Sequence, residues 1–388
     1  MTQYRPPHNT GLTAWARIHP GAITHNLHWL RERLHAATPR GAKAPRLWAV
    51  VKSDAYGHGL QPTLGAIADA EGVCVGDLHE AHRARALGWR RPLLMLSAWG
   101  LTADELRDPV LDELHVVVDD PDTLAVIGSA SPGLPRLHVW LRHAGHLRGL
   151  GFAGEEYARA FHGLQARGEA GELAAVGHLH HYAAPEHPRL VAAELAALSA
   201  LTHDLPGPRC TGSSAALCNP DTLALHGQED WVRCGLTLYG ASALPGLTGA
   251  SLGLMPAMSV QARILVVRRV AAGETVGYGA EFRANRNTCI GIVGIGYGHG
   301  VPRNLWQHGF VLAGRKGRRV PLAGRVAMDC LSIDLGPEPT EAPGDVVTLW
   351  GCAPGGAALP VEEAGQACDT IAAELLTGLT ARLPLLVD

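Results

Sequence analysis

The chain has 388 residues, of which 47% are hydrophobic and 18% are charged, and its formal net charge is −3. This length allows two domains with sizeable cores, whereas the small net charge gives no electrostatic basis for binding nucleic acid or a membrane surface, and no apolar run reaches the roughly 18 residues of a membrane helix. The N-terminal residues contain no apolar segment typical of a secretion signal, and the eight cysteines form no Cys-x-x-Cys pair, so we expect a cytoplasmic protein with reduced thiols.

Up to Tyr239, short apolar runs alternate with segments of helical periodicity. The first predicted helix follows His19, with Ile23, Leu27 and Leu30 at helical spacing. The predicted strands are residues 47–51, 72–76, 92–97, 114–119, 136–142, 174–181, 209–214 and 231–239. Eight strand–helix units over about 230 residues predict an α/β fold of the (β/α)8 TIM-barrel type, in which active groups lie at the carboxyl ends of the strands. An open, doubly wound sheet is the alternative, but no Gly-x-Gly-x-x-Gly opens a helix after a strand.

The pattern changes after Tyr239. Residues 240–256 are rich in Gly, Ala, Ser, Leu and Pro, which is typical of a linker or loop. Further strands are predicted at residues 260–270, 289–295, 310–313, 320–322, 330–335 and 346–350, and a helix only at 370–379. We therefore predict a barrel domain over residues 12–254 and a mainly β domain over residues 255–388, which residues 1–11 also join.

The first barrel strand delivers a lysine, Lys52, to a polar turn that contains two glycines. Of the 33 basic residues only three are lysines, and Lys52 alone stands at the end of an apolar strand. Unlike arginine, a lysine can lose its proton when desolvated and attack a carbonyl group. From this stretch alone, an ordinary strand-end lysine that extends to solvent remains an equal alternative.

The sequence around this lysine, Val50-Val51-Lys52-Ser53-Asp54-Ala55-Tyr56-Gly57-His58-Gly59, resembles the pyridoxal-phosphate signature of the alanine racemase family, and the resemblance continues along nearly the whole chain. It implies a fold type III isomerase whose cofactor, pyridoxal 5'-phosphate (PLP), is bound covalently by Lys52. It also implies a homodimer that shares its active sites and interconverts L- and D-alanine for peptidoglycan precursors.

The resemblance implies further cofactor contacts. The segment from Val232 to Gly240 is similar to the one that places an arginine, here Arg233, against the ring nitrogen. A guanidinium group only donates hydrogen bonds, so the nitrogen stays unprotonated and the ring is a weaker electron sink, which favours racemisation over decarboxylation. His181 matches the histidine that orients the ring. The implied phosphate cradle consists of Tyr56, Ser213, Ser214 and the backbone of Gly235 and Leu236.

Racemisation requires a proton acceptor and a proton donor on opposite faces of the Cα atom. Lys52 would serve one face. Tyr278, in Val276-Gly277-Tyr278-Gly279, resembles the family tyrosine that serves the other face and does so from the partner subunit. Tyr297 and Met328 match residues on the substrate side of the site. The resemblance therefore implies catalysis by two bases, one from each subunit.

The stretch after the fifth barrel strand departs from the family pattern. Arg148 matches the arginine that pairs with the substrate carboxylate and the phenolic oxygen of the cofactor. However, the lysine that orients this arginine in many members falls on Leu141, and an additional glycine follows Arg148. The aspartate expected after Tyr297 and Gly298 is replaced by His299. The sequence therefore does not decide which amino acid is the substrate, and a racemase of serine or a larger amino acid is the alternative.

Two other classes of function are alternatives. A non-catalytic PLP-binding protein would share the barrel, but such proteins usually lack the β domain that carries Tyr278. His178, His180 and His181 could bind a metal ion, but no acidic residue or cysteine lies near them in the sequence, so no metal is predicted. The leading hypothesis remains a PLP-dependent amino-acid racemase.

Overall fold

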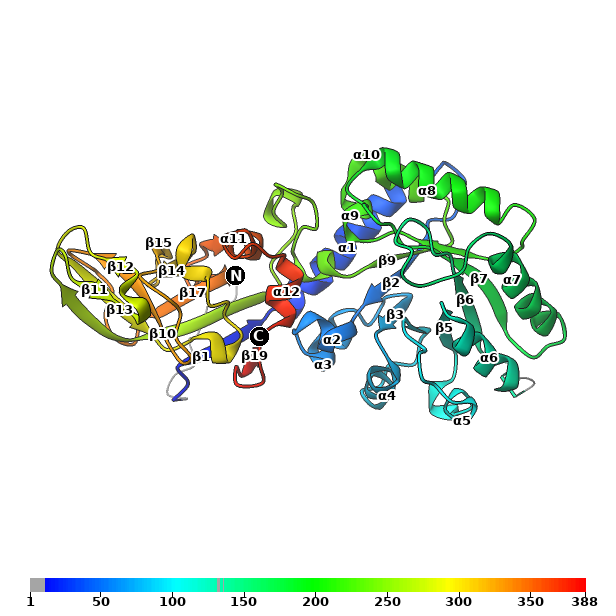
Figure 1. Ribbon diagram of the computed structural model, residues 1–388, viewed down its shortest axis with the longest axis horizontal. Helices are drawn as coiled ribbons and strands as arrows, with labels where there is room; N and C mark the ends of the chain where they lie inside the picture. Colours follow the sequence, from blue (N-terminus) through cyan, green and yellow to red (C-terminus); the bar gives the residue numbers. More distant parts are fainter. Residues whose placement is uncertain (1–10, 131–132, 135) are drawn as a thin grey trace.

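The computed structural model describes residues 11–130, 133–134 and 136–388. The molecule is elongated, with a barrel of parallel strands at one end and a β domain at the other (Figure 1). Residues 1–10, most of the N-terminal segment that we expected to join the β domain, lie outside the described residues. Within the described part, no helix has both the length and the apolar character needed to cross a bilayer.

Eight parallel strands form a closed barrel in chain order. They are β2 (Arg46–Val50), β3 (Gly72–Val75), β4 (Leu93–Met95), β5 (Leu114–Val118), β6 (His138–Arg142), β7 (Ala175–Leu179), β8 (Arg209–Thr211) and β9 (Trp231–Cys234). Each overlaps one of the eight predicted runs, and β9 pairs with β2 to close the barrel. The predicted TIM barrel is therefore confirmed, and the open-sheet alternative is wrong.

Aromatic side chains fill the barrel interior. Trp48 and Trp231 stack with their ring centroids 4.1 Å apart, and Trp140 joins the same cluster from β6. Val50 and Leu179 belong to this cluster and also line a pocket at the carboxyl ends of the strands. The tryptophans therefore form a rigid floor beneath the pocket, because side chains pack the interior of such a barrel rather than leaving it open.

Helices follow the barrel strands as the alternation of patterns predicts. They are α1 (Pro20–Ala37), α2 (Lys52–Tyr56), α3 (Leu60–Ala66), α4 (Leu78–Ala86), α5 (Ala103–Leu106), α6 (Pro121–Ala130), α7 (Gly154–Glu169), α8 (Pro188–Leu201), α9 (Ser214–Cys218) and α10 (Pro220–Leu223). Helix α1 confirms the first predicted helix, since Ile23, Leu27 and Leu30 are buried on its inner face. Helix α4 starts at a defined position because the Asp77 side chain caps it, accepting a hydrogen bond from the backbone N–H of Glu80.

The second domain is mainly β, as predicted. Its nine-stranded sheet contains β1 (Ala14–Ile18), β10 (Met258–Val270), β13 (Thr288–Val293), β14 (Phe310–Ala313), β15 (Arg318–Pro321), β16 (Leu331–Gly336), β17 (Val346–Cys352), β18 (Ala358–Leu359) and β19 (Leu385–Val387). Strands β11 (Thr275–Val276) and β12 (Phe282–Arg283) form a separate hairpin at the end farthest from the barrel (Figure 1). Helix α12 (Ala372–Thr377) matches the predicted helix, whereas α11 (Val361–Ala367) lies where no helix is predicted.

Strand β1 corrects the expected start of the barrel domain. We expected residues 12–254 to form that domain, but β1 pairs antiparallel with β10 and parallel with β19, so residues 14–18 belong to the second sheet. The side chain of Trp15 strengthens this pairing, because its Nε1 donates a hydrogen bond of 3.0 Å to Gln261 on β10. The boundary expected near residue 255 falls between β9 and β10.

Helix α12 brings the β domain to the mouth of the barrel. Gly57, just after α2, lies so close to α12 that a Cβ atom at this position would be 2.2 Å from the carbonyl oxygen of Leu376. Ile371 and Ala373, at the start of α12, line the same pocket as the carboxyl ends of the barrel strands. The pocket is therefore built from both domains.

Candidate active site

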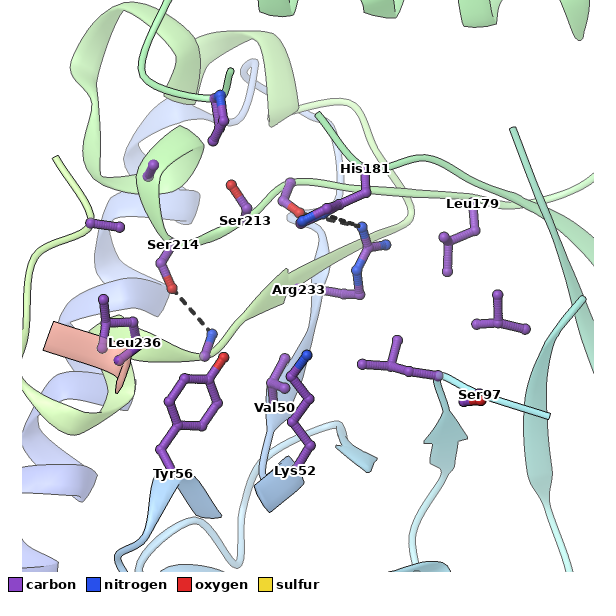
Figure 2. A pocket seen from close by; sticks show the side chains of 18 of the residues that line it. Val50, Lys52, Tyr56, Ser97, Leu179, His181, Ser213, Ser214, Arg233 and Leu236 are labelled. Carbon is purple, nitrogen blue, oxygen red and sulfur yellow. Dashed lines mark hydrogen bonds between the residues drawn. The ribbon is translucent and has the colours of Figure 1, made fainter. Parts of the chain in front are cut away.

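A pocket of about 630 Å³ opens at the carboxyl ends of the barrel strands. Lys52, Tyr56, His181 and Arg233 all line it, although they come from distant parts of the chain. Figure 2 shows the Lys52 amine directed toward Arg233 and the Arg233 guanidinium next to His181. The structure thus brings together Lys52, His181, Ser214 and Arg233, which the sequence places at strand ends, as expected for active groups in a TIM barrel. Tyr56 joins them from the turn after the first strand.

Lys52 is the first residue of α2 and follows β2 directly. Its side chain is exposed to solvent inside the open pocket rather than enclosed in the apolar core. An amine at this place can react with a carbonyl group that enters the pocket.

Tyr56 ends α2 and points its hydroxyl into the pocket (Figure 2). Its ring stacks on Tyr239 with the centroids 5.0 Å apart, and the Tyr239 hydroxyl in turn donates a hydrogen bond of 2.9 Å to the carbonyl oxygen of Val50. Burial raises the pKa of Tyr56 to about 12, so the hydroxyl keeps its proton at neutral pH. Tyr56 is therefore a fixed hydrogen-bond donor rather than a base.

Arg233, on β9, is buried and held at several points. Its Nη2 donates a hydrogen bond of 2.6 Å to the carbonyl oxygen of His180, and its Nη1 donates one of 3.2 Å to that of Cys210. The Nη2 group also lies 3.4 Å from Nδ1 of His181, which must accept because arginine only donates (Figure 2). Enclosure by the pocket, followed by the charge of Arg233, lowers the pKa of His181, so this ring is neutral at pH 7.

Small residues and hydroxyl groups form one wall of the pocket. The Ser214 Oγ accepts hydrogen bonds from the backbone N–H of Gly235 at 3.2 Å and of Thr237 at 3.3 Å. A Cβ atom at Gly235 would lie 2.5 Å from the Tyr56 hydroxyl oxygen, so only glycine leaves this wall open. Ser213 and Leu236 also line it. A concavity of hydroxyls and backbone is the kind of surface that receives a phosphate group.

Arg148 does not reach the pocket in this structure. It is exposed, has a left-handed backbone with φ of 53°, and is not among the residues that line the cavity, whereas Arg142 is.

The Arg142 Nη1 lies 3.3 Å from Oδ2 of Asp119, whose side chain is only 7% exposed. Burial lowers the pKa of Arg142 and raises that of Asp119, although each group offsets part of the shift of the other.

The alternation of side chains along β6 explains this difference from the sequence prediction. Trp140 belongs to the barrel interior and Arg142 lines the pocket above it, whereas Leu141 is buried in the core around the barrel. The family lysine falls on Leu141 in the sequence, but the side chain that continues from the barrel interior into the pocket is that of Arg142. The sequence contains a signal for Arg142, because an apolar strand that ends in a cation also marks Lys52.

Tyr278, Tyr297 and Met328 lie on the β domain and are not among the described residues that line the pocket of the same chain. These three residues are 69%, 40% and 52% exposed in the single chain. The segments of Tyr297 and Met328 are joined, since the backbone N–H of Gly298 donates a hydrogen bond of 2.9 Å to the carbonyl oxygen of Met328. Tyr278 follows β11, in the hairpin farthest from the barrel (Figure 1).

Comparisons with known proteins match both domains. The family "Alanine racemase, N-terminal domain" matches residues 18–243, and "Alanine racemase, C-terminal domain" matches residues 257–387. The alanine racemase of Acidovorax sp. (strain JS42) is 39% identical over 381 residues, which cover 96% of this chain and 98% of that protein. The chain belongs to the alanine racemase family.

Solved structures of this family support the assignment. The crystal structure of the biosynthetic alanine racemase from Pseudomonas aeruginosa superposes with a TM-score of 0.85 at 33% identity, covering 97% of this chain and 99% of that one. The alanine racemase from Acinetobacter baumannii gives a TM-score of 0.84 at 28% identity, covering 97% and 99%. The predicted family and the prediction of an enzyme of the racemase class, an isomerase, are therefore confirmed.

Three histidines lie on β7 or directly after it, namely His178, His180 and His181, and they make different contacts. The His178 Nδ1 lies 2.7 Å from the Tyr157 hydroxyl outside the barrel, whereas His181 lines the pocket. The buried His180 lies 2.9 Å from a carboxylate oxygen of Glu194, an acidic neighbour that is remote in sequence. Among the described residues, no group of three potential ligands is arranged to hold a metal ion.

Proposed function

We propose that the protein is a PLP-dependent alanine racemase, a cytoplasmic homodimer that interconverts L- and D-alanine by a two-base mechanism and supplies D-alanine for peptidoglycan. The proposal rests on one observation above all: the pocket gathers an amine, a fixed guanidinium and a wall of hydroxyls and glycine at the barrel mouth. Family membership supports this reading, since curated relatives of nearly full length are alanine racemases.

The described residues fit the cofactor. Three cations line the pocket, those of Lys52, Arg142 and Arg233, against the single carboxylate of Asp119, so the pocket favours anionic ligands. The cradle of Tyr56, Ser213, Ser214, Gly235 and Leu236 would hold the phosphate, and Lys52 would bind the carbonyl carbon. His181 and Arg233 would hold the ring and its nitrogen. When bound, the cofactor makes the Cα proton of an amino acid acidic by withdrawing electrons from that carbon.

The two bases would come from two copies of the chain. Lys52 accepts or donates the Cα proton on one face of the substrate, and Tyr278 does so on the other. Because Tyr278 lies on the hairpin farthest from its own barrel, it would reach the pocket of a second copy, together with Tyr297 and Met328. The high exposure of all three side chains in the single chain supports this arrangement.

Arg142 would take the place that the sequence prediction gave to Arg148. Its side chain lines the pocket together with Lys52 and Arg233, so its positive charge is presented to a ligand there. Asp119 would hold this guanidinium in position, as the partly buried ion pair indicates. The carboxylate of the amino acid is the ligand group that matches such a donor.

Exchanging Arg142 for glutamine is therefore expected to raise the KM for alanine by about 10–100-fold, since a hydrogen bond to a charged group contributes ~1.5–3 kcal/mol. The matched control is Arg148→Gln, which removes an exposed arginine six positions further on and should change KM by less than about twofold. Steady-state kinetics of both variants decide the question. A larger effect at Arg148 would reverse the assignment.

The function itself is tested by a panel of L-amino acids, alanine and serine included, incubated with the protein and PLP in deuterated water. Chiral chromatography should detect D-alanine, and mass spectrometry should detect deuterium at its Cα. A preference for serine or a larger amino acid would assign the broader racemase instead. A protein that binds PLP but interconverts no member of the panel would be the non-catalytic alternative.

A further inference from the structure

The turn that follows Lys52 has an unusual backbone. Ser53, Asp54, Ala55 and Tyr56 all lie in the left-handed region, with φ of 57°, 51°, 56° and 52°. Such a conformation is unfavourable for every residue that carries a Cβ atom, and it normally occurs at single positions rather than in runs. A run of four without any glycine must therefore be held by the surrounding structure.

This turn determines where two pocket residues lie, because it starts at Lys52 and ends at Tyr56. Two backbone hydrogen bonds close the far end of the turn: the Gly57 N–H donates to the carbonyl oxygen of Ser53 and the Gly59 N–H to that of Asp54, each at 3.0 Å. At the near end, the Ala55 N–H donates a hydrogen bond of 2.8 Å to the carbonyl oxygen of Val51. These bonds leave the backbone N–H of Asp54, near the lysine, to an acceptor from outside the turn.

Glu80, on α4, supplies that acceptor. Its Oε1 accepts a hydrogen bond of 3.1 Å from the Asp54 N–H, and its Oε2 accepts one of 2.8 Å from the N–H of Gly76, directly after β3. One carboxylate thus ties the strained turn to the end of the neighbouring barrel strand. Gly76 is close to the lysine too, since a Cβ atom there would lie 3.6 Å from the Lys52 Cβ.

We propose that Glu80 is a positioning residue: its carboxylate holds the left-handed turn in place and thereby aims Lys52 and Tyr56 into the pocket. This inference rests on the proposed function, which gives those two residues their tasks. Arg83, also on α4, bonds to the Asp54 carboxylate at 2.8 Å, but both side chains are 42% exposed, and exposed ion pairs contribute little. We therefore expect the hydrogen bonds of Glu80 to hold the turn more strongly than the ion pair of Arg83 does.

The test compares Glu80→Gln with the control Arg83→Gln on the same helix. A glutamine has one acceptor oxygen, so one of the two N–H groups faces an NH2 group instead. We expect E80Q to weaken PLP binding and to lower kcat, each by at least ~10-fold, with the KM for alanine changed by less than about threefold. R83Q should stay within about threefold of the wild type in all three quantities.

A second substitution shows whether E80Q lowers kcat by displacing the strained turn or by disturbing the fold in general. Glycine adopts the left-handed conformation without a Cβ penalty. Ser53 is exposed, so Ser53→Gly in the E80Q background should raise kcat at least about threefold above that of E80Q alone. If E80Q unfolds at the assay temperature, the shorter Glu80→Asp should show the same loss of PLP affinity. Unchanged affinity and kcat in the Glu80 variants, an equal loss in R83Q, or no rescue by S53G would overturn the inference.

The wild-type protein distinguishes this failure from failure of the proposed function. If the wild type binds no PLP at Lys52, the proposed function is wrong. If it binds PLP and racemises alanine while E80Q does so equally well, only the inference about Glu80 is wrong.

Discussion

Substitution of Lys52 by alanine is expected to abolish the absorbance band at ~420 nm that marks PLP joined to a lysine amine, and to lower racemase activity by at least ~10³-fold. The reason is that Lys52 would hold the cofactor and exchange a proton with the substrate, so one substitution removes both contributions. Its exposed position in the open pocket means that alanine removes little buried surface, and the fold should persist.

Lys316→Ala is the matched control, because Lys316 is an exposed lysine in a turn of the β domain. Absorbance spectra and thermal unfolding of both variants, recorded with and without PLP, separate loss of the cofactor bond from loss of the fold. A variant K52A that keeps the band, or a variant K316A that loses it, would contradict the assignment of Lys52.

The barrel could be predicted because its signals are local. Each of its strands is a short apolar run, and turn residues separate these runs from the helices. Strand β1 could not be assigned to its sheet in the same way, because its pairing partner β10 starts at Met258. Helix α11 also escaped prediction, since it is short and contains Gly365, which weakens a helical pattern.

The location of a residue at the pocket could be predicted where it stands inside a long motif, as Lys52, Tyr56 and Arg233 do. The location of a residue could not be predicted where it depends on the direction in which a side chain leaves its strand. Arg142 and Leu141 are neighbours in sequence, but the alternation of a strand sends one into the pocket and the other into the surrounding core. Glu80 illustrates a further limit, because its significance depends on a left-handed turn that contains no glycine and thus gives no sequence signal.

Replacing Tyr278 by phenylalanine is expected to lower racemisation by about 10²–10³-fold, since only the hydroxyl that exchanges a proton is removed. Lys52 would remain able to remove the Cα proton of one enantiomer. In deuterated water, this variant should therefore still exchange that proton in either L- or D-alanine, but not in both. Because the substitution removes one oxygen atom and keeps the ring, thermal unfolding should be unchanged. Equal exchange in both enantiomers would show that another group serves the second face.

Mixing the two inactive variants tests whether Tyr278 acts across the dimer. In a mixed dimer of K52A and Y278F, one site combines the intact Lys52 of one chain with the intact Tyr278 of the other, while the second site lacks both groups. After random exchange of equal amounts, half of the dimers are mixed and half of their sites are complete, so about a quarter of wild-type activity should return. If both groups acted within one chain, every site would lack one of them and no activity would return. The fraction of activity recovered therefore reports directly which subunit lends the tyrosine.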